Sequence, residues 1–211
     1  MGYVGFMLGG IVNSGKEAEM IINPLMDIMI LLLSPMIGFL LSRRSFNCLK
    51  EDSYSQMLIY FRSLPIPIEV VMLSRYIQMG VAIIFNGIIV YGMMYVLAFS
   101  IGDIHVSEFL VFVLTWVGFT IMINALYIHF EYLTRGHTYL WFMILLMLCT
   151  GIAAIIVDAL GGNVVRYTIQ YSVKYGFASP LMWGTLIISI IMLTLLGRIT
   201  KRKLEQRSIV K

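Results

Sequence analysis

The sequence predicts an all-α, polytopic membrane protein with about six transmembrane helices and an amphipathic cytoplasmic helix. Hydrophobic residues make up 60% of the 211 residues and charged residues only 12%. The charges also fall almost entirely between long apolar stretches. Soluble domains are about half apolar and a quarter charged. Residues 1–211 therefore suit one membrane domain, with no room for a second, soluble catalytic domain.

Five stretches are long enough to cross a bilayer, which takes roughly 20 mostly apolar residues for about 30 Å of hydrocarbon. They do not alternate apolar and polar residues, so they predict helices and not the strands of a barrel. Residues 1–12 are apolar but shorter, and we expect a short or truncated first helix there. The predicted full spans are 21–41, 76–99, 109–129, 138–157 and 181–199.

The loops differ in charge according to the side of the membrane they reach. The loop 43–75, the short loop 130–137 and the C-terminal tail contain 12 of the Lys and Arg residues, and the remaining loops contain 3. Loops rich in Lys and Arg stay in the cytoplasm. We therefore expect a multi-pass protein of the cell membrane whose C-terminus is cytoplasmic. The spread of these charges over loops does not indicate a nucleic-acid-binding surface.

The segment 159–180 falls on the outer side of this topology. Its residues Val164, Tyr167, Tyr171 and Lys174 recur at intervals of three or four. This spacing predicts a short amphipathic helix on the outer membrane surface. An ordinary outer loop is the alternative.

The loop 43–75 is the most informative part of the chain for function. Pro65 and Pro67 end any helix before them, and Glu69 is well placed near the start of the helix that follows. We expect a short helix, a stiff proline elbow and then a transmembrane helix, an arrangement that transmits displacement. An interfacial anchor is the alternative. The residues that share one face of the short helix are Leu49, Met57, Leu58 and Phe61.

Several short motifs resemble a known family, the ABC type-2 (exporter-type) permease superfamily, in its small bacterial members. In the loop, the acidic pair Glu51-Asp52 leads to the turn Ser63-Leu64-Pro65 and then to Ser74-Arg75-Tyr76. The stretch Tyr127 to Tyr132, followed by Arg135-Gly136, is similar to the end of the fourth span in that family. Members usually begin with a cytoplasmic basic segment and a full first span, and residues 1–12 depart from that pattern.

The resemblance implies a six-helix permease subunit in a bacterial cytoplasmic membrane. It would pair with a second permease subunit, as a homodimer or heterodimer, and bind two copies of a separate cytoplasmic ABC ATPase. ATP and magnesium would belong to that partner, so we expect neither enzymatic activity nor a cofactor in this chain. The residues expected at the ATPase contact are Glu51, Asp52, Met57, Leu58, Phe61, Ser63, Leu64 and Pro65.

Asp27 is the one strongly polar residue well inside a predicted span. An ionisable group within the bilayer costs about 2.5–3.5 kcal/mol, so it usually faces a cavity or a partner. Asp27 is therefore a candidate for lining the translocation path, with Asn86 as a second candidate. Interhelical hydrogen bonds also explain Asn86 and Asn124. The candidate partners for an ion pair with Asp27 are Lys16, Arg166 and Lys174.

No catalytic or metal-binding pattern stands out in the sequence. His129, Glu131 and His137 lack the spacing of a helical zinc site, and we interpret them as interfacial polar residues. The predicted function is an exporter permease for a hydrophobic or amphipathic substrate, such as a peptide, a lipid-like molecule or a drug. Two alternatives are a membrane scaffold or sensor and an ion-coupled carrier. The carrier would need several acids or bases inside the spans, and Asp27 is the single candidate.

Overall fold

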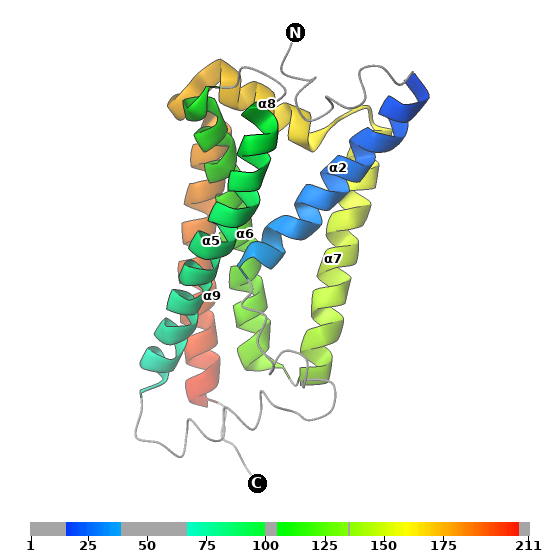
Figure 1. Cartoon of the computed structure of the whole chain (residues 1–211). Coiled ribbons are helices and arrows are strands. Elements are labelled where there is room, and N and C mark those ends of the chain that lie inside the picture. The colour runs from blue at the N-terminus through cyan, green and yellow to red at the C-terminus, as the bar shows by residue number, and fades with distance from the viewer. Residues whose placement is uncertain (1–15, 39–66, 100–104, 135, 207–211) are drawn as a thin grey trace.

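The computed structural model describes residues 16–38, 67–99, 105–134 and 136–206 (Figure 1). These residues contain six α-helices, one short 3-10 helix and no strand, so the all-α prediction is confirmed. The α-helices are α2 (Lys16–Ile37), α5 (Ile68–Phe99), α6 (Val106–Leu133), α7 (Gly136–Ala159), α8 (Val164–Tyr175) and α9 (Pro180–Gln206); the 3-10 helix is η1 (Gly176–Ala178).

Four helices, α5, α6, α7 and α9, are long and apolar enough to cross a membrane. They coincide with the last four spans predicted from the sequence, and the chain is a multi-pass membrane protein. Helix α5 starts at Ile68, so the helix that was expected to begin near Glu69 and run into the next span is one continuous element. Pro67 precedes it, and its carbonyl accepts the N–H groups of Val70 and Val71 at 3.0 and 3.4 Å.

Helix α2 differs from the span predicted at 21–41. The helix is 22 residues long and ends at Ile37, before the predicted end of the span. It runs obliquely through the bundle and ends beside the middle of α6 (Figure 1). The residue after the helix is Gly38, where the close approach of Asn124 leaves no room for a side chain.

Helix α6 is the centre of the bundle and contacts every other helix. A row of aromatic rings lines its first half: Tyr95 of α5 meets Phe109 at 5.1 Å between centroids, and Trp116 meets Phe119 edge-on at 5.7 Å. At Gly118 the neighbouring helix α9 approaches closely. A methyl group on Gly118 would lie 2.9 Å from the Thr185 hydroxyl oxygen and 3.0 Å from the Thr185 carbonyl carbon.

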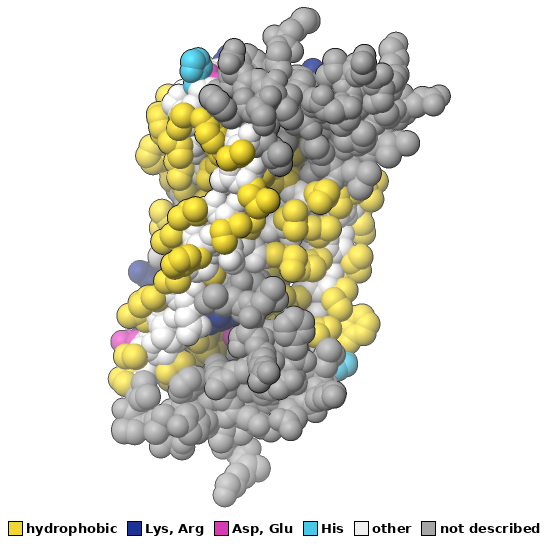
Figure 2. All heavy atoms as spheres, viewed as in Figure 1, with side chains coloured by type: hydrophobic (Ala, Val, Ile, Leu, Met, Phe, Trp, Pro, Cys, Tyr) yellow, Lys and Arg dark blue, Asp and Glu magenta, His cyan; other side chains and the backbone are white. Residues whose placement is uncertain are grey.

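Helix α7 stands apart from this core. It packs chiefly against α2, and Phe142 stacks on Phe130 of α6 at 4.2 Å between ring centroids. In its most apolar stretch only 6% of the residues are buried, against 56% in α6, so α7 presents most of its apolar surface outward. Hydrophobic side chains cover much of the described surface between the two ends of the molecule (Figure 2).

The two ends of the bundle have different charges. Helices α5 and α7 begin, and α6 and α9 end, at what we call the basic end, at the bottom of Figure 1. Helix α8 lies across the opposite end, here called the α8 end. This arrangement agrees with the topology expected from the loops, in which the basic end is cytoplasmic. The described cations at the basic end are Arg75, Arg198, Lys201, Arg202 and Lys203; those of α8 are Arg166 and Lys174.

The helix predicted in the outer segment is confirmed as α8. The stripe through Tyr167 and Lys174 is exposed, and Tyr167 is 57% accessible. Small and polar side chains are buried instead, because they allow α8 to lie flat against α6. The buried residues of α8 are Val165, Thr168 and Ser172.

Candidate functional site

A buried ion pair joins α5 to α6 at the basic end. Arg75 Nε donates to Glu131 Oε2 at 2.9 Å, and Glu131 is only 5% exposed. Attraction between the two charges is strong where water is excluded, and either charge alone would be costly to bury. The pair therefore fixes the first turns of α5 against the last turns of α6.

Two further contacts lie at the basic end, one between the same two helices and one that extends the connection to α9. The Tyr132 hydroxyl donates to the carbonyl oxygen of Val71 at 3.3 Å, next to the ion pair. Lys201 of α9 forms an exposed ion pair with Glu69 in the first turn of α5. Together, these contacts at the basic end join the side chains of Glu69, Arg75, Glu131, Tyr132 and Lys201.

The histidines near this end do not form a metal site with the acids. His129 Nδ1 lies 2.6 Å from the Thr200 hydroxyl oxygen, so it joins α6 to α9. His137 packs on Trp141 of its own helix, at 6.4 Å between ring centroids. Within the described ranges, no group of three His, Cys, Asp or Glu side chains is arranged to hold a metal ion.

A second polar cluster surrounds the end of α2 at the mid-depth of the bundle. The last carbonyls of a helix lack partners within that helix, and the hydrocarbon core offers no water to replace them. Helix α6 supplies two donors: the Thr120 hydroxyl bonds the Ser34 carbonyl, and the Asn124 amide bonds the Pro35 carbonyl, both at 2.9 Å. These bonds make it possible for a helix to end inside the bundle.

Asn86 of α5 completes this cluster. Its amide nitrogen donates to the Ile37 carbonyl at 2.9 Å. Gly38 directly follows Ile37. A methyl group on Gly38 would lie 2.4 Å from the Asn124 amide nitrogen, so the end of α2 meets α6 without space for a side chain. The interhelical hydrogen bonds expected for Asn86 and Asn124 are confirmed.

Asp27 lies near the middle of α2, ten positions before Ile37, and is fully buried. Its two carboxylate oxygens accept the backbone N–H groups of Val164 at 2.7 Å and of Val165 at 3.0 Å. Asn163 accepts the N–H of Arg166 at 2.7 Å. The first three N–H groups of α8 are thereby bonded, and a carboxylate is favoured at the positive end of a helix.

The structure tests the placement of only two of the predicted site residues. The ATPase-contact residues, Glu51 to Pro65, lie outside the described residues, as do residues 1–12. Asp27 and Asn86, the two candidates for the translocation path, lie at different depths, because Asp27 bonds α8 and Asn86 bonds the end of α2 at Ile37. Asp27 contacts the backbone of α8, which is a different partner from the ion pairs that the sequence suggested.

The ion pair between Arg75 and Glu131 was not predicted. Both residues lie in motifs on which the family resemblance depends, but they are 56 positions apart in the chain. One signal was present in the sequence: a base near the start of one span and an acid near the end of another should reach the same membrane face. The sequence offers no comparable signal for Asp27, because its partners are backbone N–H groups.

Comparison of the chain with protein-family models, with curated protein sequences and with solved structures finds no match.

Proposed function

We propose that this chain is the membrane-spanning permease subunit of an ATP-driven ABC exporter of the type-2 superfamily. It would move a hydrophobic or amphipathic substrate across the bacterial cytoplasmic membrane, with its basic end in the cytoplasm. ATP hydrolysis would take place in two copies of a separate ATPase. Loop 43–75 would bind that ATPase, and a second permease subunit would complete the pathway.

The observation that carries the proposal is the connection between the first turns of α5 and the rest of the bundle. The last residues of the predicted loop 43–75, from Ile68 on, are the first turns of helix α5, which continues unbroken for 32 residues, about 48 Å. The ion pair between Arg75 and Glu131 joins its beginning to α6, and the pair between Glu69 and Lys201 joins it to α9. A push on the loop would therefore displace three spans together.

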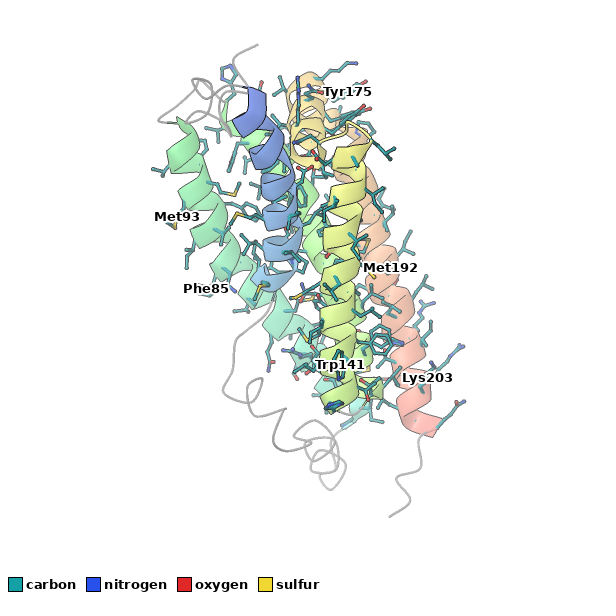
Figure 3. All side chains as sticks on the ribbon, turned by 90° about the vertical axis from the view of Figure 1, so that its right-hand side faces the viewer. Phe85, Met93, Trp141, Tyr175, Met192 and Lys203 are labelled. Carbon is teal, nitrogen blue, oxygen red and sulfur yellow. The ribbon has the colours of Figure 1, made fainter. Side chains whose placement is uncertain are left out.

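The outer faces of the helices also suit an assembly within a membrane. Phe85 and Met93 project from α5 away from the bundle, and Trp141 lies on the outward side of α7 (Figure 3). All three are more than half exposed in the isolated chain. Lipid tails or a second subunit would cover them. Asn86 remains a candidate for contact with the substrate, whereas Asp27 would reach the substrate only if α2 and α8 separated, because it is fully buried against α8.

Co-purification of the native complex tests the proposal most directly. We expect an ABC ATPase to accompany the chain from native membranes, and the double variant Glu51→Lys with Asp52→Lys to lose it, because the acidic pair would face the ATPase. Glu205→Lys is the control for charge reversal at the same end, since Glu205 is an exposed acid of α9 that pairs at 3.8 Å with Lys201 of its own helix. Normal ATPase recovery with the loop variant would count against the proposal.

Transport in vesicles separates the exporter from its two alternatives. An exporter requires ATP and continues when ion gradients are dissipated. A carrier without ATP would show the opposite dependence, and a scaffold or sensor would move no substrate under either condition. Uptake into inside-out vesicles, measured with and without ATP and with an ionophore, distinguishes these outcomes.

A further inference from the structure

Helix α2 is fixed by polar bonds at two places, at Asp27 near its middle and at Ile37, its last residue. Asp27 bonds two N–H groups at the start of α8, and the Ile37 carbonyl accepts the amide of Asn86 from α5. Ten residues separate Asp27 from Ile37, which is about 15 Å of helix. Helix α2 thus connects the middle of α5 with the outer helix α8.

The contact with α5 involves packing as well as the hydrogen bond. Ile37 belongs to the same buried cluster as Tyr91 of α5. Gly87 of α5 lies beside it, because a methyl group on Gly87 would be 4.0 Å from the Ile37 side chain. A movement of this part of α5 therefore presses directly on the end of α2.

The contact with α8 is made through directional bonds to backbone groups. Asp27 is completely buried and accepts both bonds, so its loss leaves the N–H groups of Val164 and Val165 without this acceptor. A shift of α2 along its axis would lengthen both bonds and expose the first turn of α8. The start of α8 is therefore sensitive to the position of α2.

We propose that α2 is a strut that couples α5 to α8, with Asn86 as the positioning residue at its C-terminal end and Asp27 as the positioning residue near its middle. A displacement of α5 at mid-depth moves α2, and α2 loosens or tightens the outer helix. The direction of use, from an ATPase toward the outer face, rests on the proposed function. The mechanical link itself does not, so it can be tested on the full chain alone.

Hydrogen exchange at the start of α8 tests the link in the full-length protein in nanodiscs. Asp27→Asn should speed exchange of the Val164 and Val165 amides about fivefold, because one acceptor of the cap is lost. Asn86→Leu removes the bond at the far end of α2 and should also speed exchange at α8, by about twofold or more. The measurement is mass spectrometry of peptides that cover residues 160–170.

Phe85→Leu is the matched control, since Phe85 neighbours Asn86 on α5 but points away from the bundle (Figure 3). It should leave exchange at α8 unchanged. The double variant Asp27→Asn with Asn86→Leu should exchange no faster than Asp27→Asn alone, because both substitutions break one chain of contacts. If Asp27→Asn does not fold, the comparison of Asn86→Leu with Phe85→Leu still decides the question.

Wild-type exchange at α8 in Asn86→Leu would overturn the strut, and Asp27 would then be a local cap. Additive effects in the double variant would overturn it as well. Because no ATPase is present, either failure leaves the assignment as an exporter permease untouched. Conversely, loss of that assignment through the co-purification experiment would leave the strut standing.

Discussion

Helices α6 and α7 follow each other in the chain and are similarly apolar, yet α6 is largely buried within the bundle and α7 is largely exposed. Over their most apolar stretches, 56% of the residues of α6 are buried and only 6% of those of α7. Trp116 of α6 is 3% exposed, whereas Trp141 of α7 is 60% exposed. Apolar composition places both helices in a membrane, but it does not tell which one packs against protein.

The physical reason is that lipid and protein interiors are equally apolar. Burying an apolar side chain between helices gains little hydrophobic free energy when the alternative is a lipid tail. Close packing and polar bonds select the neighbours instead. Helix α6 has Gly118, Thr120, Asn124 and Glu131, each in contact with another helix, and the described part of α7 has no comparable series.

The largest difference in stability between variants of the two helices should appear when one acid in each helix is neutralised. Glu131→Gln should lower the free energy of unfolding by about 3 kcal/mol, because Arg75 remains partly buried without its charged partner. Asp158→Asn in α7 should cost less than about 1 kcal/mol, since Asp158 is half-buried and near the end of its helix. Unfolding by sodium dodecyl sulfate in mixed micelles measures both values.

The double variant Arg75→Leu with Glu131→Leu is the control for the ion pair. Replacement of both charges removes the buried pair without leaving a single charge behind, so it should cost less than Glu131→Gln. If Glu131→Gln and Asp158→Asn lowered the free energy of unfolding equally, Glu131 would contribute no more to stability than Asp158.

The second comparison uses the two tryptophans. Trp116→Ala should destabilise the protein by about 2 kcal/mol, because it opens a cavity within the aromatic row of α6. The usual transfer contribution is small here, since the surroundings are apolar in the unfolded state too. Trp141→Ala should change stability by less than about 0.5 kcal/mol. The same micelle titration measures both, and a larger effect at Trp141 would show that α7 is covered by another subunit.

These expectations show where sequence reasoning succeeds and where it stops. The four spans and α8 were predictable because apolar length and helical spacing are local properties of the chain. The early end of α2 was not, since it depends on donors from Asn86, Thr120 and Asn124, which are 49 to 89 positions away from the carbonyls they bond. The coupling residues of loop 43–75 lie outside the described residues and stay predictions.

The smallest expected effect is the change in stability on replacing a glycine with alanine, which should have opposite signs in α6 and α7. Gly118→Ala should destabilise the protein by about 1 kcal/mol, because the added methyl group meets the backbone of α9 at 3.0 Å. This overpacking outweighs the stabilisation expected from the higher helix propensity of alanine. Gly151→Ala in α7 meets nothing within 4 Å, so it should stabilise slightly. Thermal unfolding in one detergent compares the two variants. Destabilisation by both would mean that α7 is packed as closely as α6 in the assembled protein, with a neighbour seated at Gly151.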